Sequence, residues 1–222
     1  MPTIETASSW YPLSDPVHGF DHVLRVYRLA ERLAQAEGAD LEIVRAAVLL
    51  HDATPDPAMT NQPTNQPTNQ SSNRSTHHHA SAAFARQVLQ VEGWPEERIA
   101  AVEHCIRAHR FRDDSEQPQT LEAQVLFDAD KLDAIGAIGV ARAIAYAARA
   151  GCPAYTEPSD GFVRSGKLAA GELHSSYHEF LFKLRKLKDR MYTAGARQMA
   201  EERHRRMEAF YTDLAAETRG ER

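Results

Sequence analysis

The sequence of 222 residues predicts an all-α protein, and three observations support this fold class. Apolar residues recur at helical spacing over most of the chain. No segment alternates between apolar and polar residues as a half-buried strand does, and no hairpin signal joins two apolar runs. Glycine, proline and aspartate stand where the periodic segments begin or end. We therefore expect a helical bundle formed by a single domain.

End signals mark the predicted helices of the first half. Gly38 follows the first periodic segment as a stop, and Asp40 is the expected N-cap of the next helix. Pro95 stands in the first turn of a later helix, where its missing N–H costs nothing. The predicted helices of this half cover 17–37, 41–52, 80–92 and 95–109.

The second half carries two further periodic segments. One long segment runs over 121–150 and contains Gly136 and Gly139. Because glycine weakens a helix, we expect these two positions to permit the close approach of a neighbouring element. The other segment, 171–218, combines many charges with apolar positions that serve either the core of the domain or a homodimer contact.

A low-complexity stretch interrupts this helical pattern. Residues 60–71 repeat the tetrapeptide Thr-Asn-Gln-Pro almost without change, and such a sequence cannot build a core. We expect a flexible insertion over 53–78, within a domain over 17–218 that follows an N-terminal extension over 1–16. The insertion is either a neutral surface loop or a mobile flap. The run His77-His78-His79 at its end can bind metal adventitiously.

Composition and termini narrow the function classes. The formal net charge of -5 disfavours general binding of nucleic-acid polymers or membranes. The first ten residues show neither the basic n-region nor the apolar h-region of a secretory leader, so we expect none, and no apolar stretch approaches the roughly 18 residues of a membrane span. Cys105 and Cys152 are expected to be reduced thiols. We expect a cytoplasmic monomer or homodimer.

The adjacent pair His51-Asp52 closes an apolar run over 43–50. Burying a carboxylate beside an imidazole is costly unless both are paired or bind a cation. Antiparallel packing of the helices over 17–37 and 41–52 would place His22 near this pair. An acid from a third helix would complete a metal site, and spacing alone does not choose among Asp128, Asp130 and Asp133.

Four stretches together resemble the HD-superfamily metal-dependent phosphohydrolases. They are the His18 to Val26 entry, Leu49-Leu50-His51-Asp52, Ala108-His109-Arg110-Phe111, and the very specific Asp-Ala-Asp-Lys-Leu-Asp-Ala-Ile-Gly-Ala-Ile-Gly over 128–139. A weaker match near His178 follows. The resemblance covers most of 17–215 and implies an HD-type helical bundle.

The resemblance also implies a metal site and its ligands. Its motif selects Asp130 among the three acids, so the implied ligands are His22, His51, Asp52 and Asp130. Such a mixed nitrogen and oxygen set suits one divalent ion, Mn²⁺ or Mg²⁺ first, with Fe²⁺, Co²⁺ or Ni²⁺ as alternatives.

Further residues are assigned by analogy with the family. As catalytic groups we expect Asp56, Lys131 and His109. Their alternative roles are, in the same order, a solvated turn residue, one partner of a structural ion pair and a helix-capping cation. As substrate-binding groups we expect Arg25, Arg110 and Lys183. His18, one turn from His22, is expected to support the ligands.

The implied activity is attack of a metal-bound water on phosphorus in a small phosphorylated substrate. The resemblance favours a nucleotide, with a (deoxy)nucleoside triphosphate giving a monophosphate and pyrophosphate. The alternatives are a nucleotide monophosphatase or phosphodiesterase of the same superfamily, and a non-catalytic module that senses nucleotides through the metal.

Overall fold

The computed structural model describes residues 1–11, 19–53, 77–110 and 116–222. All the regular elements in these ranges are helices, which confirms the predicted all-α class, and none of them is long and apolar enough to cross a membrane. They form two compact units, Met1–Asp130 and Lys131–Arg222. The predicted domain over 17–218 stays a prediction. The repeat, His18 and Asp56 lie outside the described residues.

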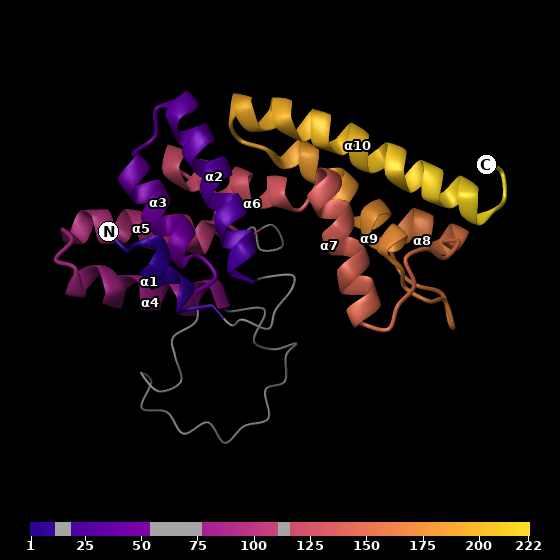
Figure 1. Ribbon diagram of the computed structural model, residues 1–222, viewed down its shortest axis with the longest axis horizontal. Coiled ribbons are helices and arrows are strands. Elements are labelled where there is room, and N and C mark those ends of the chain that lie inside the picture. Colours follow the sequence, from indigo (N-terminus) through magenta and orange to yellow (C-terminus); the bar gives the residue numbers. More distant parts are fainter. Residues whose placement is uncertain (12–18, 54–76, 111–115) are drawn as a thin grey trace, which may run out of the picture. The chain divides into compact units, whose positions relative to one another are not determined.

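Helix α3 is the central element of the first unit and contacts α1, α2, α4 and α5 (Figure 1). Its apolar residues are almost all buried, as expected from the run over 43–50. The helices of this unit are α1 (Ile4–Ser8), α2 (Phe20–Glu37), α3 (Leu41–Leu50), α4 (His77–Val91), α5 (Glu96–Ala108) and α6 (Leu121–Asp133), with the unit boundary near the end of α6.

The end signals of the first two long helices act as predicted. Gly38 adopts a left-handed conformation with φ of 80° and ends α2. Asp40 caps α3 by accepting hydrogen bonds from the backbone of the first turn. Its hydrogen bonds with Arg98 hold the pKa of this carboxyl below its usual range. Helix α3 ends at Leu50, two residues before the predicted limit, so His51 and Asp52 lie in the following turn.

The N-terminal residues pack within the first unit through a short helix that the sequence did not predict. The hydroxyl of buried Tyr11 donates to the backbone oxygen of Leu49 at 3.0 Å. The Trp10 ring meets Phe84 of α4 edge to face. These contacts fasten the N-terminal segment to α3 and α4.

The predicted single segment over 121–150 is wrong, because the chain breaks after α6 and begins a new helix at Gly136. Gly136 has a positive φ of 79°, which disfavours any residue with a Cβ. At Gly139 a Cβ would lie 2.7 Å from the methyl group of Met207. The close approach expected at both glycines is therefore confirmed.

In the second unit, α10 packs against α7 and η2, and α9 packs against the same two elements. Tyr211 is fully buried and stacks on Phe180 with ring centroids 4.6 Å apart, and Met207 is buried beside them in α10. These apolar positions thus serve the core of the unit, whereas Leu173, Phe182 and Phe210 of the same segment are exposed. Its helices are α7 (Gly136–Arg149), α8 (Asp160–Ser165), α9 (Ser176–Phe182), the 3-10 helix η2 (Leu184–Arg190) and α10 (Ala194–Thr218).

The two cysteines differ in exposure. Cys105 is fully buried in α5, and burial raises the pKa of its thiol far above its usual range. Cys152 follows α7 and is partly exposed. Both are free thiols, as the sequence predicted.

Candidate metal centre

Three side chains from separate elements of the first unit converge on one point. His22 comes from α2, His51 from the turn after α3 and Asp130 from α6, and one ligand atom of each lies within 4.8 Å of the other two. His22 Nε2 lies 3.4 Å from Asp130 Oδ1. The His22 and His51 rings have centroids 5.6 Å apart, which confirms that the ends of α2 and α3 meet as predicted.

The ring of His51 is oriented for ligation. Its Nδ1 lies 2.7 Å from the backbone oxygen of Val48, so Nδ1 carries the proton and the Nε2 lone pair points into the cluster. His51 is completely buried, and its Nε2 has no hydrogen-bond partner among the described residues. Leaving a buried polar atom unsatisfied costs about 1–3 kcal/mol. A cation at this point would satisfy the atom, so these residues fit a metal.

Asp52 lies between two sets of imidazoles. Its Oδ2 is 3.5 Å from His51 Nε2, whereas its Oδ1 is 3.2 Å from His77 Nε2 and 3.7 Å from His109 Nε2. The buried Oδ1 makes no hydrogen bond of normal geometry with any described residue. Burial alone would raise the pKa of Asp52, but the surrounding histidines outweigh it and hold the pKa well below its usual range. The carboxylate is therefore ionised at neutral pH, as a metal ligand must be.

Asp52, His77 and His109 form a second group that could hold a cation, again with ligand atoms within 4.8 Å of one another. His109 is buried at the end of α5, and its Nδ1 lies 2.5 Å from the backbone oxygen of Ile106. The sequence analysis named His109 as a catalytic group and gave His77 only adventitious metal binding. The only signal for His77 was its place in the triple-histidine run.

Two buried hydroxyl groups hold the turn that carries His51 and Asp52. Tyr11 donates to the oxygen of Leu49 just before the turn, and Ser81 of α4 donates to the oxygen of Ala53 just after it, both at 3.0 Å. Burial, with the charge of Asp52, raises the pKa of Tyr11, which stays a neutral donor. Sequence reasoning missed both groups because neither belongs to a recognisable motif.

The three acids that spacing could not separate have different surroundings. Asp130 joins His22 and His51. Asp133 is buried and forms an ion pair with Arg142 at 2.6 Å. Asp128 is fully buried on α6. Asp130 is therefore the acid of this segment that approaches the imidazoles, which is the position the family motif selected.

Most of the cationic residues predicted for catalysis or substrate binding contact a neighbouring side chain, and their catalytic and substrate-binding roles stay predictions. His104, five residues before His109 on α5, pairs with Glu116 at 2.9 Å. Arg25 pairs with Asp21 at 2.6 Å, and the Arg110 guanidinium lies 3.4 Å from His78 Nδ1. Lys183 of the second unit pairs with Glu179 at 2.9 Å. Half-buried Lys131 directly follows Asp130.

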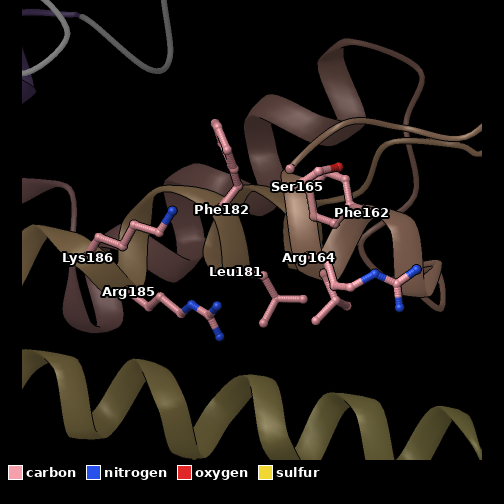
Figure 2. A pocket seen from close by; sticks show the side chains of 9 residues that line it. Phe162, Arg164, Ser165, Leu181, Phe182, Arg185 and Lys186 are labelled. Atoms are coloured by element: carbon pink, nitrogen blue, oxygen red, sulfur yellow. The ribbon is translucent and has the colours of Figure 1, made fainter.

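The second unit contains a pocket between α8 and the segment of α9 and η2 (Figure 2). Exposed Arg164, Arg185 and Lys186 surround it, and the Lys186 ammonium lies 4.8 Å from the Phe182 ring centroid. Its volume of about 120 Å³ is well below the roughly 300–1,000 Å³ of small-molecule sites. This pocket is too small for a nucleotide.

The chain is similar to a known protein family and to solved structures. A family model described as the HD domain matches residues 19–135. Over 210 residues the chain is 33% identical to the uncharacterized protein YpgQ of Bacillus subtilis strain 168, covering 91% of this chain and 85% of that protein. The crystal structure of Bacillus subtilis YpgQ in complex with ADP gives a TM-score of 0.67 at 30% identity over 97% of each chain. The crystal structure of an HD-superfamily hydrolase from Bacillus thuringiensis gives a TM-score of 0.66 at 30% sequence identity, covering 97% of this chain and 96% of that chain.

Proposed function

Because the chain belongs to the HD-domain family, we propose that it is a metal-dependent phosphohydrolase acting on a small phosphorylated substrate, in the first place a nucleotide. In this proposal a divalent cation is held by His22, His51, Asp52 and Asp130. The observation that carries the proposal is the buried Nε2 of His51, which faces a converging set of nitrogen and oxygen donors without a hydrogen-bond partner among the described residues.

The donor set indicates the class of ion. Two imidazoles and two carboxylates suit Mn²⁺ or Mg²⁺, with Fe²⁺, Co²⁺ and Ni²⁺ as further possibilities. A cation bound here would polarise a phosphoryl group and lower the pKa of water. The contact of His51 Nδ1 with the backbone oxygen of Val48 directs Nε2 toward the cluster, and the lowered pKa of Asp52 keeps that group a carboxylate, so both residues present ligand atoms to a cation.

A nucleoside triphosphate is the substrate we favour. In its hydrolysis, the oxygen of water bonds to the α-phosphorus, the bridging bond between α-phosphorus and oxygen breaks, and pyrophosphate leaves with the electron pair. The water loses its protons to the solvent, and a nucleoside monophosphate remains. The crystal structure of the relative YpgQ in complex with ADP supports a nucleotide as the ligand.

A nucleotide panel tests this proposal. The chain is stripped with a chelator, incubated with nucleoside tri-, di-, mono- and cyclic phosphates with and without Mn²⁺, and the products are separated by chromatography. We expect monophosphate and pyrophosphate from triphosphates only when Mn²⁺ is present. Release of inorganic phosphate from monophosphates, or opening of cyclic nucleotides, would instead identify a monoesterase or a phosphodiesterase.

The variant Asp52→Ala should abolish turnover, because it removes a carboxylate from the centre of the cluster. Asp213→Ala is the matched control, since Asp213 is a half-exposed acid of α10 that pairs with Arg222 in the second unit. Metal-dependent nucleotide binding without turnover on any member of the panel would contradict the enzyme and favour a sensing module.

A further inference from the structure

The pocket between α8 and the segment of α9 and η2 combines apolar walls with a basic rim (Figure 2). We propose that it is a docking site for an acidic peptide segment, which inserts one aliphatic side chain into the pocket and pairs its carboxylates with the rim. All the residues that line the pocket belong to the second unit, so the inference goes beyond the proposed function and does not rest on it.

The size of the pocket determines what can enter it. Its volume is about 120 Å³, and for comparison an apolar cavity of roughly 150 Å³ holds a benzene molecule. Phe162, Leu181 and Phe182 supply apolar side chains to its walls. The pocket therefore accepts a single aliphatic side chain, such as that of leucine.

Phe182 forms an exposed wall whose ring is held from two directions. The ring is 50% exposed, and the Lys186 ammonium lies 4.8 Å from its centroid. Gly166 approaches the ring so closely that a Cβ at this position would lie 2.1 Å from Phe182 Cε2. A ring that is already fixed loses little conformational freedom when a partner binds, so its contacts contribute more of their energy to affinity.

The rim of the pocket consists of the exposed cations Arg164, Arg185 and Lys186. None of the three forms an ion pair with any residue that the structure describes, and no acidic residue lines the pocket. Nearby Lys183, by contrast, pairs with Glu179 at 2.9 Å. Because the formal net charge of the chain is -5, these three cations are a local excess of positive charge. Charge complementarity therefore favours an anionic partner.

The arrangement favours a peptide over a small inorganic anion. The charged ends of the three rim cations are spread apart rather than directed at one point (Figure 2). The N–H of Gly166 donates to the backbone oxygen of Phe162 at 2.7 Å, and the N–H of Lys167 donates to the Ser165 hydroxyl at 3.2 Å. A phosphate pocket would direct such N–H groups at the ligand. An extended chain can instead bring separate carboxylates to separate cations.

The same surface is less suited to a lipid bilayer. Helix α8 covers only Asp160–Ser165, which is too short for an amphipathic helix that lies in a membrane interface. An anionic membrane would also face the net negative charge of the whole chain. A short peptide at the rim is affected mainly by charges within the Debye length, about 8 Å at physiological ionic strength.

Fluorescence anisotropy with synthetic peptides tests the inference on the full chain. The probe is a fluorescein-labelled nonapeptide with a central leucine and four glutamates on each side. We expect saturable binding that weakens as salt is added. The same peptide with a central glycine should bind about ten-fold more weakly, because it buries no aliphatic side chain. A peptide with lysine in place of every glutamate should not bind.

Variants locate the site on the protein. Arg185→Gln and Lys186→Gln should each weaken binding about three-fold, the effect of losing one exposed ion pair. Phe182→Ala should weaken it about ten-fold. Arg205→Gln and Phe210→Ala are the matched controls and should bind like the wild type, because both residues are exposed on α10 outside the pocket. Circular dichroism spectra like that of the wild type would show that each variant is folded.

The outcomes separate this inference from its alternatives. Absence of binding of the leucine peptide to the wild type overturns it. Equal affinity for the leucine and glycine peptides overturns it in favour of a site for anions alone. Co-sedimentation of the chain with phosphatidylserine vesicles, without peptide binding, overturns it in favour of a lipid surface. Equal losses in the pocket variants and in their controls also overturn it. None of these measurements follows nucleotide hydrolysis, so the proposed function stands or fails separately.

Discussion

Each unit of the molecule sets a carboxylate against buried histidine, but the two carboxylates are satisfied very differently. In the second unit, Glu172 accepts hydrogen bonds from the backbone N–H groups of Ser159 and Ala169 and from the Ser159 hydroxyl, at 2.6–2.8 Å. His178 Nε2 completes the set at 3.2 Å. In the first unit, Asp52 leaves Oδ1 without a normal hydrogen bond among the described residues.

This difference separates a carboxylate that the protein itself satisfies from one that we propose binds a metal ion. Backbone N–H groups of Ser159 and Ala169 lower the pKa of Glu172 to about 2, and all of this stabilisation comes from within the folded unit. A buried polar atom whose hydrogen bonds all come from the protein needs no ligand. A buried polar atom without such hydrogen bonds indicates a partner from outside the protein. The contrast shows why the presence of histidine beside an acid does not by itself identify a metal site.

The largest expected effect is a Mn²⁺-dependent gain in the free energy of unfolding that requires Asp52 of the first unit and not Glu172 of the second. At a free Mn²⁺ concentration 100-fold above its dissociation constant, wild-type protein should gain about 2.7 kcal/mol, seen as a rise of several degrees in melting temperature. Asp52→Asn should remove most of this rise, and Glu172→Gln should retain it. An equal manganese-dependent rise in Asp52→Asn and wild type would contradict the comparison.

The next effect concerns Glu172 and does not depend on metal. Glu172→Gln should lower the melting temperature at pH 7 by several degrees without Mn²⁺, because the amide replaces an acceptor oxygen that binds backbone N–H groups. The folded pKa of Glu172 is depressed, so its stabilisation is present above about 4.5 and is lost as the pH falls toward about 2. The deficit of the variant should therefore shrink over this range.

Melting curves followed by circular dichroism from pH 7 to pH 2.5 measure this deficit. Glu217→Gln, a change at an exposed glutamate of α10, provides the control and should melt like the wild type at every pH. A deficit that stays constant down to pH 2.5 would mean that the charge of Glu172 does not stabilise the second unit.

The smallest effect tests whether a residue outside the motif holds the turn that carries His51 and Asp52. Tyr11→Phe removes the hydrogen bond to Leu49 and should cost about 1 kcal/mol of unfolding free energy. Because this bond steadies the turn before His51, Mn²⁺ affinity in a calorimetric titration should also fall a few-fold. Tyr146→Phe, at an exposed tyrosine of α7, should change neither quantity. Unaltered affinity in Tyr11→Phe would limit Tyr11 to a role in stability.

Local signals made much of the first unit predictable. Gly38 and Asp40 determine where α2 ends and α3 begins, and the short connection between them brings His22 to His51. Spacing did not select among the acids of α6, whereas the family motif pointed to Asp130. The metal-ligand roles stay predictions, but the convergence of three of the four side chains is a property of the fold.

Tertiary contacts explain what the sequence did not reveal. The helical period continues across the break before Gly136, and the close approach of Arg203 of α10 to this glycine is a contact that no local pattern encodes. His77 reaches Asp52 because α4 packs on α3 and α5, after a long insertion in the chain. In the sequence Glu172 resembles any acidic loop residue, and only the hydrogen bond from the Ser159 backbone N–H in the folded unit distinguishes it.

The unequal cysteines make the protein ready for spectroscopic labelling without mutation. A thiol-reactive dye or spin label should attach at partly exposed Cys152, because the buried thiol of Cys105 is protonated and out of reach. A reporter attached there belongs to the second unit. One natural side chain thus offers a single defined attachment point for a spectroscopic label.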